Sequence, residues 1–494
     1  GEIVISREKA KRMGSWEKMT KAFENQKEVE GIITNKVKGG FIVNIESCLC
    51  FLPGSQVDTK PIKNMDTLMN VPQKFAIIKI DKLRGNCCVS RREIISSFKK
   101  EDVIELLNNT WHNFEEQDLI KITQIKQSTS ILELYHGPTA AFKDFGLQLA
   151  AAFFNEILNQ ENKTALVLGA TSGDTGSAAI DSCKKYSRIK SFIMLPNGNM
   201  SQIQRRQMTT VMSENVRAIR VNGTFDDCQD LVKQAFKVRD FLNNDQYLLA
   251  VNSINWTRIV GQICYYFYAY ANLRDHKSIS FSVPTGNFGN VFACYSAYKM
   301  GLPLKSISVA VNENDILHRF FSNNDYSKHS VLETISPSMD ISVASNFERL
   351  VYDFFLDRDS NTCANLFNSF PSNAIKFDST IWEKRHEIFL SHKVTDKETK
   401  EIISSHFFET NYLLDPHTAI GIPACIENLD SSNHYVLLAT AHPAKFPKLY
   451  EELNIDMVDV PSSLMDLKDK EENVYRLNAN YDELSNFIKI NNFN

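Results

Sequence analysis

A single lysine, Lys143, lies within the otherwise small and apolar stretch HGPTAAFKDFG at residues 136–146. Burial in an apolar pocket disfavours the charged form of an amine, so such a lysine loses its proton more readily than usual. A neutral amine is a nucleophile toward aldehydes. The stretch therefore indicates covalent chemistry at Lys143. The alternative is a lysine at a helix start that extends its amine to solvent and pairs with Asp144.

Two glycine-rich segments could hold anions close to such an amine. The segment GNFGN, residues 286–290, follows a strand-like run, and its two glycines would let backbone N–H groups converge on an anion at a helix N-terminus. It is not a Walker A motif, because Lys and then Ser or Thr do not follow the second glycine. An ordinary turn between a strand and a helix is the alternative.

The second segment, TSGDTG at residues 171–176, has hydroxyl groups at Thr171, Ser172 and Thr175 and could hold a carboxylate. The alternative is a helix N-cap formed by Asp174 or Ser172. Glycine is scarce, with 19 residues in the chain, so its recurrence in these loops indicates backbone positions that no other residue fits. A nucleophilic amine and a phosphate-binding loop on one sheet together suit pyridoxal 5'-phosphate (PLP) as the cofactor.

The elements that must position these loops alternate between strands and helices from about residue 100 onward. Buried-strand runs such as TALVLGA (164–170) and SISFSVP (278–284) are each followed by a glycine loop and a helical stretch. Such alternation predicts an α/β fold with a mostly parallel sheet. Ligands in open α/β sheets bind at the carboxyl ends of the strands, which is where both glycine loops fall.

The first hundred residues have a different pattern. They contain short strand-like runs rich in β-branched residues and separated by turns, such as EVEGIITNKVKGGFIVNI and KFAIIKIDK. This spacing predicts a small β-barrel. Basic residues accompany Phe41 and Phe51 here, and aromatic side chains beside cations on an OB-type barrel could stack on nucleic-acid bases. Alternatively, both phenylalanines belong to the core and the charges form a solvated rim.

Composition restricts the class of protein. The net charge is −4, which gives no polycationic surface for nucleic acid over the chain as a whole. No run of 18 or more apolar residues occurs, so neither a spanning helix nor a membrane partner is expected. The ten cysteines form no CxxC pair, which predicts reduced thiols in a cytoplasmic protein without a metal. Zinc held by Cys48, Cys50, Cys87 and Cys88 is the alternative, although the usual ligand spacing is absent.

Residues 1–98 closely resemble bacterial ribosomal protein S1. Residues 1–27 are similar to the end of one S1 repeat and a linker helix, and residues 28–92 to one whole OB-type repeat, through KVKGGFIVNIESCLCFLPGSQVD and KIDKLRGNCCVSRRE. The resemblance implies an RNA or ribosome partner for this segment. Its candidate RNA-binding residues are Lys38, Phe41, Phe51 and Arg91.

After a junction at residues 93–104, residues 105–494 resemble threonine synthase of the bacterial and fungal type. The matching segments follow the family's order: ELYHGPTAAFKDFGLQL, LGATSGDTGSAA, QRRQMTT, GTFDDCQ, VNSINWTRI, VPTGNFGNVFA, NENDIL, SPSMDI, SNFERL, DPHTAIG and ATAHPAKFP. The resemblance implies the type II PLP-dependent fold, in which two α/β domains surround the cofactor, behind the small S1-like barrel. The catalytic region is expected to lack the family's own N-terminal segment.

Carried over residue by residue, the resemblance makes Lys143 the catalytic lysine that forms a Schiff base with PLP. Thr440 matches the hydroxyl that meets the pyridine nitrogen, and His442 is either polar lining or a hydrogen-bonded core histidine. The loop residues assigned to the PLP phosphate are Gly286, Asn287, Phe288, Gly289 and Asn290. The residues assigned to the substrate are Thr171, Ser172, Asp174 and Thr175, near its carboxylate and the ring, and, by their charge, Arg258 and Lys445 near its phosphate.

Two residues depart from the family pattern, since Ala140 stands where Leu is usual and Asn290 where Asp is common. The implied reaction converts O-phospho-L-homoserine and water to L-threonine and phosphate in threonine biosynthesis, as a carbon–oxygen lyase acting on phosphate. Two alternatives stay open. One is a weakly active or inactive fusion with an S1-like segment that binds RNA or the ribosome. The other is a different type II PLP lyase, such as threonine dehydratase or cysteine synthase, although those families lack ATAHPAKF and SPSMDI.

Overall fold

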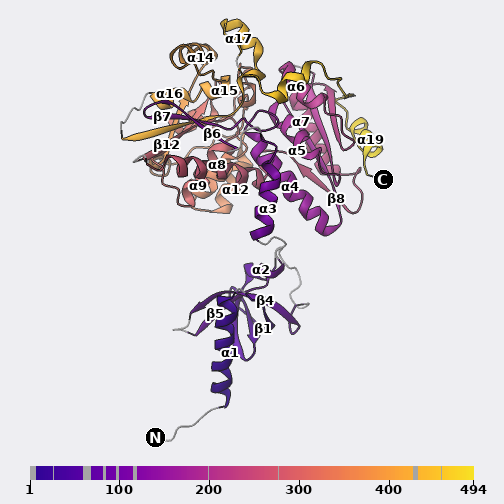
Figure 1. The fold of residues 1–494 in the computed structure, drawn as a ribbon, viewed down its shortest axis with the longest axis vertical. Helices are drawn as coiled ribbons and strands as arrows, with labels where there is room; N and C mark the ends of the chain where they lie inside the picture. Colours follow the sequence, from indigo (N-terminus) through magenta and orange to yellow (C-terminus); the bar gives the residue numbers. More distant parts are fainter. Residues whose placement is uncertain are drawn as a thin grey trace. The chain divides into compact units, whose positions relative to one another are not determined.

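A computed structural model describes residues 7–25, 27–58, 68–81, 85–95, 100–114, 119–197, 200–275, 278–426, 432–457 and 459–493. The chain divides into two compact units, residues 1–105 and residues 106–494, both drawn in Figure 1. The division falls within helix α3 (Lys100–Trp111). The boundaries suggested at residues 27, 92 and 104 stay predictions, and residues 1–6 and 96–99 of the segments they define lie outside the described residues.

The first unit is a closed five-stranded barrel with a helix before it. The strands pair in the order β1-β2-β3-β5-β4, with β3 and β5 parallel and the other pairs antiparallel. Inward-facing residues alternate with outward-facing ones along a barrel strand, as Val43, Asn44 and Ile45 show in β2. The predicted small barrel is confirmed. The elements are α1 (Arg7–Glu24), β1 (Val29–Val37), β2 (Gly40–Ile45), β3 (Cys48–Pro53), β4 (Pro72–Asp81), β5 (Asn86–Ser90) and α2 (Arg92–Ile95).

The same alternation decides where the candidate RNA-binding side chains of the barrel lie. Phe41 is 7% exposed and belongs to the barrel core, whereas Phe51 is half-buried and Lys38 is exposed. Arg91 forms an ion pair of 2.6 Å with Asp58. A ring inside the barrel presents no face to a base, so Phe41 is corrected to a core residue.

The second unit contains two sheets made mostly of parallel strands. The six-stranded sheet has the order β14-β13-β12-β15-β7-β6 and is parallel except for the pair β6 and β7. The five-stranded sheet has the order β11-β8-β9-β10-β16 and is parallel throughout. The predicted α/β architecture is confirmed. The strands are β6 (Lys121–Lys126), β7 (Thr129–Glu133), β8 (Thr164–Ala170), β9 (Ile189–Pro196), β10 (Val216–Asn222), β11 (Gln246–Ala250), β12 (Ser278–Pro284), β13 (Ser306–Val311), β14 (Phe389–Lys393), β15 (Asn433–Ala439) and β16 (Val474–Asn478).

Helices pack around these sheets, as Figure 1 shows for the second unit. Parallel strands need long connections, and here helices supply most of them. The helices are α4 (Lys143–Glu161), α5 (Asp174–Cys183), α6 (Gln202–Thr209), α7 (Phe225–Val238), α8 (Trp256–Leu273), α9 (Gly289–Lys299), α10 (Ile316–Asn323), α11 (Phe347–Leu350), α12 (Ser360–Ser369), α13 (Ser379–Trp382), α14 (Asp396–Thr410), α15 (Pro416–Ala419), α16 (Ile422–Ile426), α17 (Pro447–Leu453), α18 (Ser462–Met465) and α19 (Tyr481–Asn491).

Helix α4 carries Lys143 at its first position and packs against α5 and α8. Two glycines make the contact with α8 close. A Cβ atom added at Gly146 would lie 2.7 Å from the carbonyl oxygen of Arg258, and one added at Gly261 would lie 2.9 Å from the Cα of Gly146. Neither position has room for a side chain, so the backbones that carry Lys143 and Arg258 pack directly on each other.

Two features are absent from the described residues. No helix among them combines the length and the apolar character needed to cross a membrane. They also contain no group of three or more His, Cys, Asp or Glu side chains arranged to hold a metal ion. The four cysteines considered as zinc ligands lie on β3 and β5 as thiols.

Candidate active site

The side chain of Lys143 is buried at the start of α4. The residue is 7% exposed, and its Nζ lies 3.6 Å from Oδ2 of Asp174. Burial lowers the pKa of Lys143, the nearby charges of Lys445 and Arg258 lower it further, and the carboxylate of Asp174 opposes them. The amine therefore gives up its proton more readily than an ordinary lysine, which is what nucleophilic chemistry requires.

Asp144, the partner that a solvent-directed lysine would use, is engaged elsewhere. Its two carboxylate oxygens accept hydrogen bonds from the backbone N–H of Thr139 at 2.8 Å and from the Thr139 hydroxyl at 2.7 Å. Between these residues, Ala140 is fully buried and adopts the left-handed region, with φ of 54°. The turn thus directs Asp144 back into the loop and leaves Lys143 facing Asp174.

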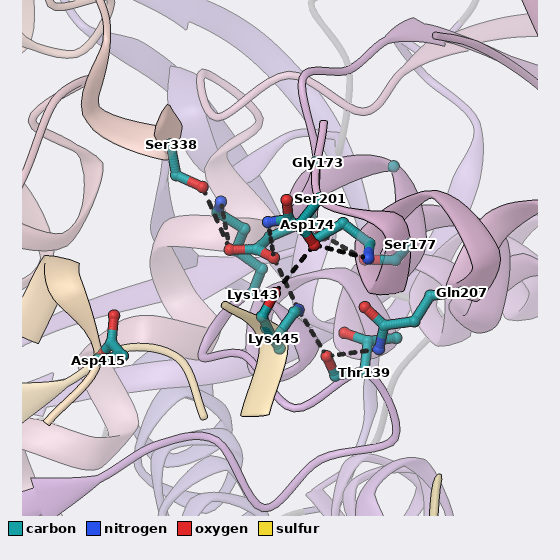
Figure 2. Close-up of polar contacts among 12 residues, drawn as sticks. Thr139, Lys143, Gly173, Asp174, Ser177, Ser201, Gln207, Ser338, Asp415 and Lys445 are labelled. Carbon is teal, nitrogen blue, oxygen red and sulfur yellow. Dashed lines mark hydrogen bonds and ion pairs between the residues drawn. The ribbon is translucent and has the colours of Figure 1, made fainter. Parts of the chain in front are cut away.

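Asp174 gathers the polar contacts of the site, as Figure 2 shows. Its Oδ1 accepts from Lys445 Nζ at 2.6 Å and from Gln204 Nε2 at 2.8 Å. Its Oδ2 faces Lys143 and accepts from the Ser338 hydroxyl at 3.2 Å. Burial alone would raise the pKa of Asp174, but the two ammonium groups hold it well below its usual range. A permanent negative charge therefore lies beside the Lys143 amine.

The loop TSGDTG positions Asp174 through internal hydrogen bonds. The Thr171 hydroxyl accepts from the N–H groups of Gly173 at 3.0 Å and Gly176 at 2.9 Å. Gly173 is the N-cap residue of α5 and has no side chain, and the N–H of Gly176 in the first turn is taken up by Thr171, so the capping role considered for Ser172 and Asp174 does not describe this loop. Ser172 and Thr175 are half-buried. Thr171 therefore fixes the shape of the loop, whereas Ser172 and Thr175 remain partly exposed.

The loop at residues 286–290 connects β12 to α9. Two of its backbone N–H groups donate to nearby side-chain oxygens. The N–H of Phe288 donates to the Thr285 hydroxyl at 3.1 Å, and the N–H of Gly289 donates to Oδ1 of Asn287 at 2.9 Å. Phe288 is fully buried with φ of 64°, which turns the chain into α9. Such a loop before a helix N-terminus suits an anion.

Two further observations fit this loop to a phosphate group. A Cβ atom added at Gly286 would lie 2.9 Å from the Cα of Met339 and 3.1 Å from Cδ1 of Ile341, so only glycine leaves the backbone accessible there. Asn290 Oδ1 accepts from the hydroxyls of Tyr266, at 2.7 Å, and Tyr265. Its buried Nδ2 has no hydrogen-bond partner among the described residues, which leaves one donor available for a ligand.

One cavity brings most of the predicted residues together. Thr440, which directly follows β15, lines it, and Phe142 adds an apolar wall. The lining residues are Phe142, Lys143, Asp174, Pro284, Thr285, Gly286, Asn287, Asn290, Ser338, Met339, His417 and Thr440. An amine, an anion-binding loop and a hydroxyl around one space suit PLP in chemistry and in placement.

The two cations predicted for the substrate phosphate lie behind this lining. Lys445 is fully buried between Asp174 and the carbonyl oxygen of Thr139, which accepts from Lys445 Nζ at 2.8 Å. Arg258 is 2% exposed, and its Nη1 donates to the carbonyl oxygen of Val251 at 2.7 Å. Burial lowers the pKa of Arg258 to about 10. Its Nε has no partner among the described residues, so this cation retains a donor.

The structure adds two residues that the sequence did not single out, His417 and Ser338. Nδ1 of His417 lies 2.9 Å from Oδ1 of Asp415, and Nε2 of His417 accepts from the backbone N–H of Ser338 at 3.3 Å. The Ser338 hydroxyl in turn reaches Asp174. Both residues occur in segments already noted, SPSMDI and DPHTAIG. An Asp two residues before a His, at a Pro-started helix, was the available signal.

His442, in contrast, is a hydrogen-bonded histidine outside this lining. Its Nδ1 accepts from the backbone N–H of Ala444 at 3.1 Å, and its ring meets that of Tyr135 edge-on at 5.2 Å. Burial, together with the nearby charge of His136, lowers the pKa of His442 to about 4. The folded protein therefore favours the neutral form of the His442 imidazole.

A pH dependence of stability follows from His442. Its folded pKa lies below the ordinary value of about 6.5, so the unfolded chain binds the proton more readily. The stability contributed by neutral His442 is complete above pH 6.5 and is lost as the pH falls toward 4, by up to about 3 kcal/mol. His442→Asn keeps an oxygen that can cap Ala444 but does not titrate, so it should flatten this part of the profile. The measurement is the free energy of unfolding by urea between about pH 4 and pH 7, and identical slopes in parent and variant would contradict the assignment.

Comparisons with known proteins agree with this geometry. The chain matches the family model for pyridoxal-phosphate dependent enzymes over residues 124–362, the model for the threonine synthase C-terminal region over residues 418–488, and the S1 RNA binding domain over residues 22–92. It is 44% identical over 388 residues to threonine synthase of Pseudomonas aeruginosa, covering 78% of this chain and 82% of that protein. It is 40% identical over 418 residues to threonine synthase of Saccharomyces cerevisiae, covering 78% and 81%.

Solved structures give the same result. The crystal structure of PLP-bound threonine synthase from Brucella melitensis aligns with a TM-score of 0.76 and 37% identity, over 80% of this chain and 85% of that one. Threonine synthase from yeast aligns with a TM-score of 0.74 and 36% identity, over 79% and 84%. The predictions of the type II PLP fold, of PLP as cofactor and of an S1 segment ahead of the enzyme are confirmed. The chain therefore belongs to the threonine synthase family.

Proposed function

We propose that this chain converts O-phospho-L-homoserine and water to L-threonine and inorganic phosphate, with PLP as its cofactor. The observation that carries the proposal is the convergence of Lys143, Asp174 and the loop 286–290 on one cavity, in a chain of the threonine synthase family. When bound, PLP draws electrons from the substrate's α-carbon and so makes proton loss from Cα and Cβ feasible.

Three parts of the chain are proposed to hold the cofactor. Lys143 would hold its aldehyde end, and the loop 286–290 at the N-terminus of α9 would hold its phosphate, aided by Nδ2 of Asn290, which has no partner among the described residues. Thr440, which also lines the cavity, would meet the ring nitrogen. A neutral hydroxyl does not stabilise a proton on that nitrogen as a carboxylate would, so the ring would remain largely unprotonated there.

Lys143 is also proposed as the acid and base of the reaction. Its amine would move protons at Cα and Cβ of the substrate. Burial keeps the pKa of Lys143 below that of an ordinary lysine, which brings it closer to the operating pH. Asp174, 3.6 Å away, would hold the ammonium form whenever Lys143 carries the proton.

The remaining site residues are proposed to bind the substrate. Ser172 and Thr175, the two half-buried hydroxyls of the TSGDTG loop, would meet the substrate carboxylate, with Thr171 fixing the loop behind them. Arg258 and Lys445 would provide positive potential where the phosphate leaves from Cγ. Both also lower the pKa of Lys143, and this supports an effect of their charge at the reacting groups.

The test of the function is an assay of the purified, PLP-loaded chain for phosphate release and threonine formation from O-phospho-L-homoserine. We expect one phosphate released for each threonine formed. Parallel assays of threonine deamination and of cysteine formation from O-acetylserine test a different PLP lyase. Activity confined to either of those substrates, or no turnover of any of the three, would reject the proposal.

For the S1 unit we propose contact with single-stranded RNA, because residues 22–92 match the S1 RNA binding domain. Lys38, which is exposed, and Phe51, which is half-buried, are the candidate side chains. Arg91 is a weaker candidate, since Asp58 already neutralises it. Fluorescence anisotropy with a labelled RNA should show weaker binding for Lys38→Ala with Phe51→Ala than for the parent, and equal binding would exclude this surface.

A further inference from the structure

A surface cavity of about 460 Å³ lies at the carboxyl ends of β10 and β16, within the five-stranded sheet. It shares no residue with the cavity that Lys143 lines. Its volume falls within the range of small-molecule sites, and ligands in open α/β sheets bind at this end of the strands. Its polar lining residues are Asn197, Arg220, Asn222, Arg476, Asn478 and Glu483.

The strand register places two arginines directly beside each other in this cavity. Arg220 of β10 is the register partner of Arg476 of β16, and two residues later Asn222 is the partner of Asn478. Residues two apart on a strand face the same side of the sheet, so these two pairs form adjacent rows on one face. Like charges directly opposite each other on neighbouring strands are destabilising unless an anion lies between them.

A third strand extends the asparagine row. Val221 of β10 is the register partner of Pro196 of β9, so Asn197, the next residue, follows at the level of Asn222. Three asparagine side chains thus lie side by side at the carboxyl ends of three neighbouring strands. Two residues earlier on β10 and β16 are the two arginines. Amides supply N–H donors around whatever oxygen atoms the guanidinium groups attract.

The two guanidinium groups lack the neutralising partners that nearby arginines have. Nη2 of Arg220 donates to Oδ1 of Asn197 at 2.5 Å, and among the described residues no carboxylate lies within ion-pair distance of Arg220 or Arg476. The carboxylate of Glu483, at the cavity edge, accepts instead from the backbone N–H of Asn478 at 3.2 Å and from its Nδ2 at 3.1 Å.

Two other arginines, close to the start of β16, are neutralised by a carboxylate. Arg205 and Arg206 both bind Glu472, at 2.9 Å and 2.7 Å. Arg217 stacks on the ring of Tyr475 and donates to two carbonyl oxygens. Arg220 and Arg476 therefore differ from Arg205 and Arg206, which share a carboxylate, and from Arg217, which stands beside no second arginine in its strand register.

We propose that this cavity binds a small molecule bearing a phosphate group, at a site separate from the active site. Two planar guanidinium groups side by side match a doubly charged, tetrahedral oxyanion. Each guanidinium group can donate two parallel hydrogen bonds to the oxygens of such an anion. Asn222 and Asn478 contact the remaining oxygens or the part of the molecule that carries the phosphate. A monocarboxylate satisfies one guanidinium and leaves the other uncompensated.

The experiment counts phosphate sites directly. The chain is first reduced with borohydride in the presence of PLP, so that the cofactor fills the active-site phosphate loop, and is then dialysed to equilibrium against radiolabelled inorganic phosphate. The parent is compared with Arg220→Gln and Arg476→Gln, and with Arg274→Gln as a control that removes the same charge from another exposed arginine. Phosphate release from O-phospho-L-homoserine is measured separately, on unreduced PLP-loaded samples of all three variants, and is expected to remain at the parent level.

We expect each cavity variant to bind one phosphate fewer than the parent, or to bind it at least tenfold more weakly, with Arg274→Gln equal to the parent. Sulfate should displace the labelled phosphate from this site, and acetate at the same concentration should not. Unchanged phosphate binding in Arg220→Gln and Arg476→Gln would overturn the proposal. Equal displacement by acetate would also overturn it, because the site would then not select a doubly charged oxyanion.

Discussion

The Lys143→Ala variant is expected to release phosphate from O-phospho-L-homoserine at least about 10³-fold more slowly than the parent, the scale of a lost general acid and base. Lys143 is the amine that faces Asp174 in the cavity, and burial lowers its pKa. Borohydride reduction of the PLP-loaded parent should fix the cofactor on the peptide that contains residue 143, as peptide mass spectrometry will show. The same treatment of Lys143→Ala should give no adduct.

Two further variants separate the chemistry from the fold. Lys143→Arg keeps a cation against Asp174 but does not deprotonate near neutral pH, so it should fold, bind PLP without a reducible bond and remain inactive. Lys185→Ala removes a lysine whose pKa burial also lowers but which does not line the cavity, and it should behave as the parent. A reducible adduct that persists in Lys143→Ala or Lys143→Arg would assign the covalent role to another residue.

The Gly286→Val variant should weaken PLP binding about 10²-fold, which corresponds to one or two lost hydrogen bonds to a charged group. The reason is steric. A Cβ atom at this position would lie 2.9 Å from the Cα of Met339, which is backbone and does not move aside as a long side chain would. The loop 286–290 must therefore shift away from the phosphate. The measurement is the dissociation constant of PLP, from absorbance or fluorescence titration.

The matched control for Gly286→Val is Gly14→Val, because a Cβ atom at Gly14 would meet nothing within 4 Å. Melting temperatures of both variants without PLP distinguish loss of binding from loss of folding. A Gly286→Val protein that melts like the parent but binds PLP weakly supports the phosphate loop. Parent-like PLP affinity in that variant would place the phosphate elsewhere in the cavity.

The two local parts of the site could be predicted from sequence, because each is a short segment whose residue types restrict its conformation. The glycines of GNFGN predict a close backbone approach, and the lysine in HGPTAAFKDFG predicts a buried amine. The pairing of Asp174 with Lys445 was not predictable, because the two residues are distant in sequence and meet only when the loops after β8 and β15 are brought together. For the same reason, the contact between Ser338 and Asp174 could not be predicted from the sequence.

The barrel shows a different limit. Phe41 and Phe51 look alike in sequence, as aromatic residues among cations, and only the register of the closed barrel separates them. Phe41 falls on the inner face with Val43, whereas Phe51 remains half-buried. Which basic residue is neutralised is also decided in three dimensions, as the ion pair of Arg91 with Asp58 shows.

Asp174 connects the two sheets of the second unit through its carboxylate. It follows β8 of the five-stranded sheet, whereas Lys445 follows β15 of the six-stranded sheet and Ser338 packs beside Met339 on that same side. Any hinge motion that separates the two sheets must break both contacts at one carboxylate. When Lys143 is neutral, Asp174 keeps only one ammonium partner, Lys445. The carboxylate that faces the reacting amine is thus the same one that ties the loop after β8 to the loop after β15.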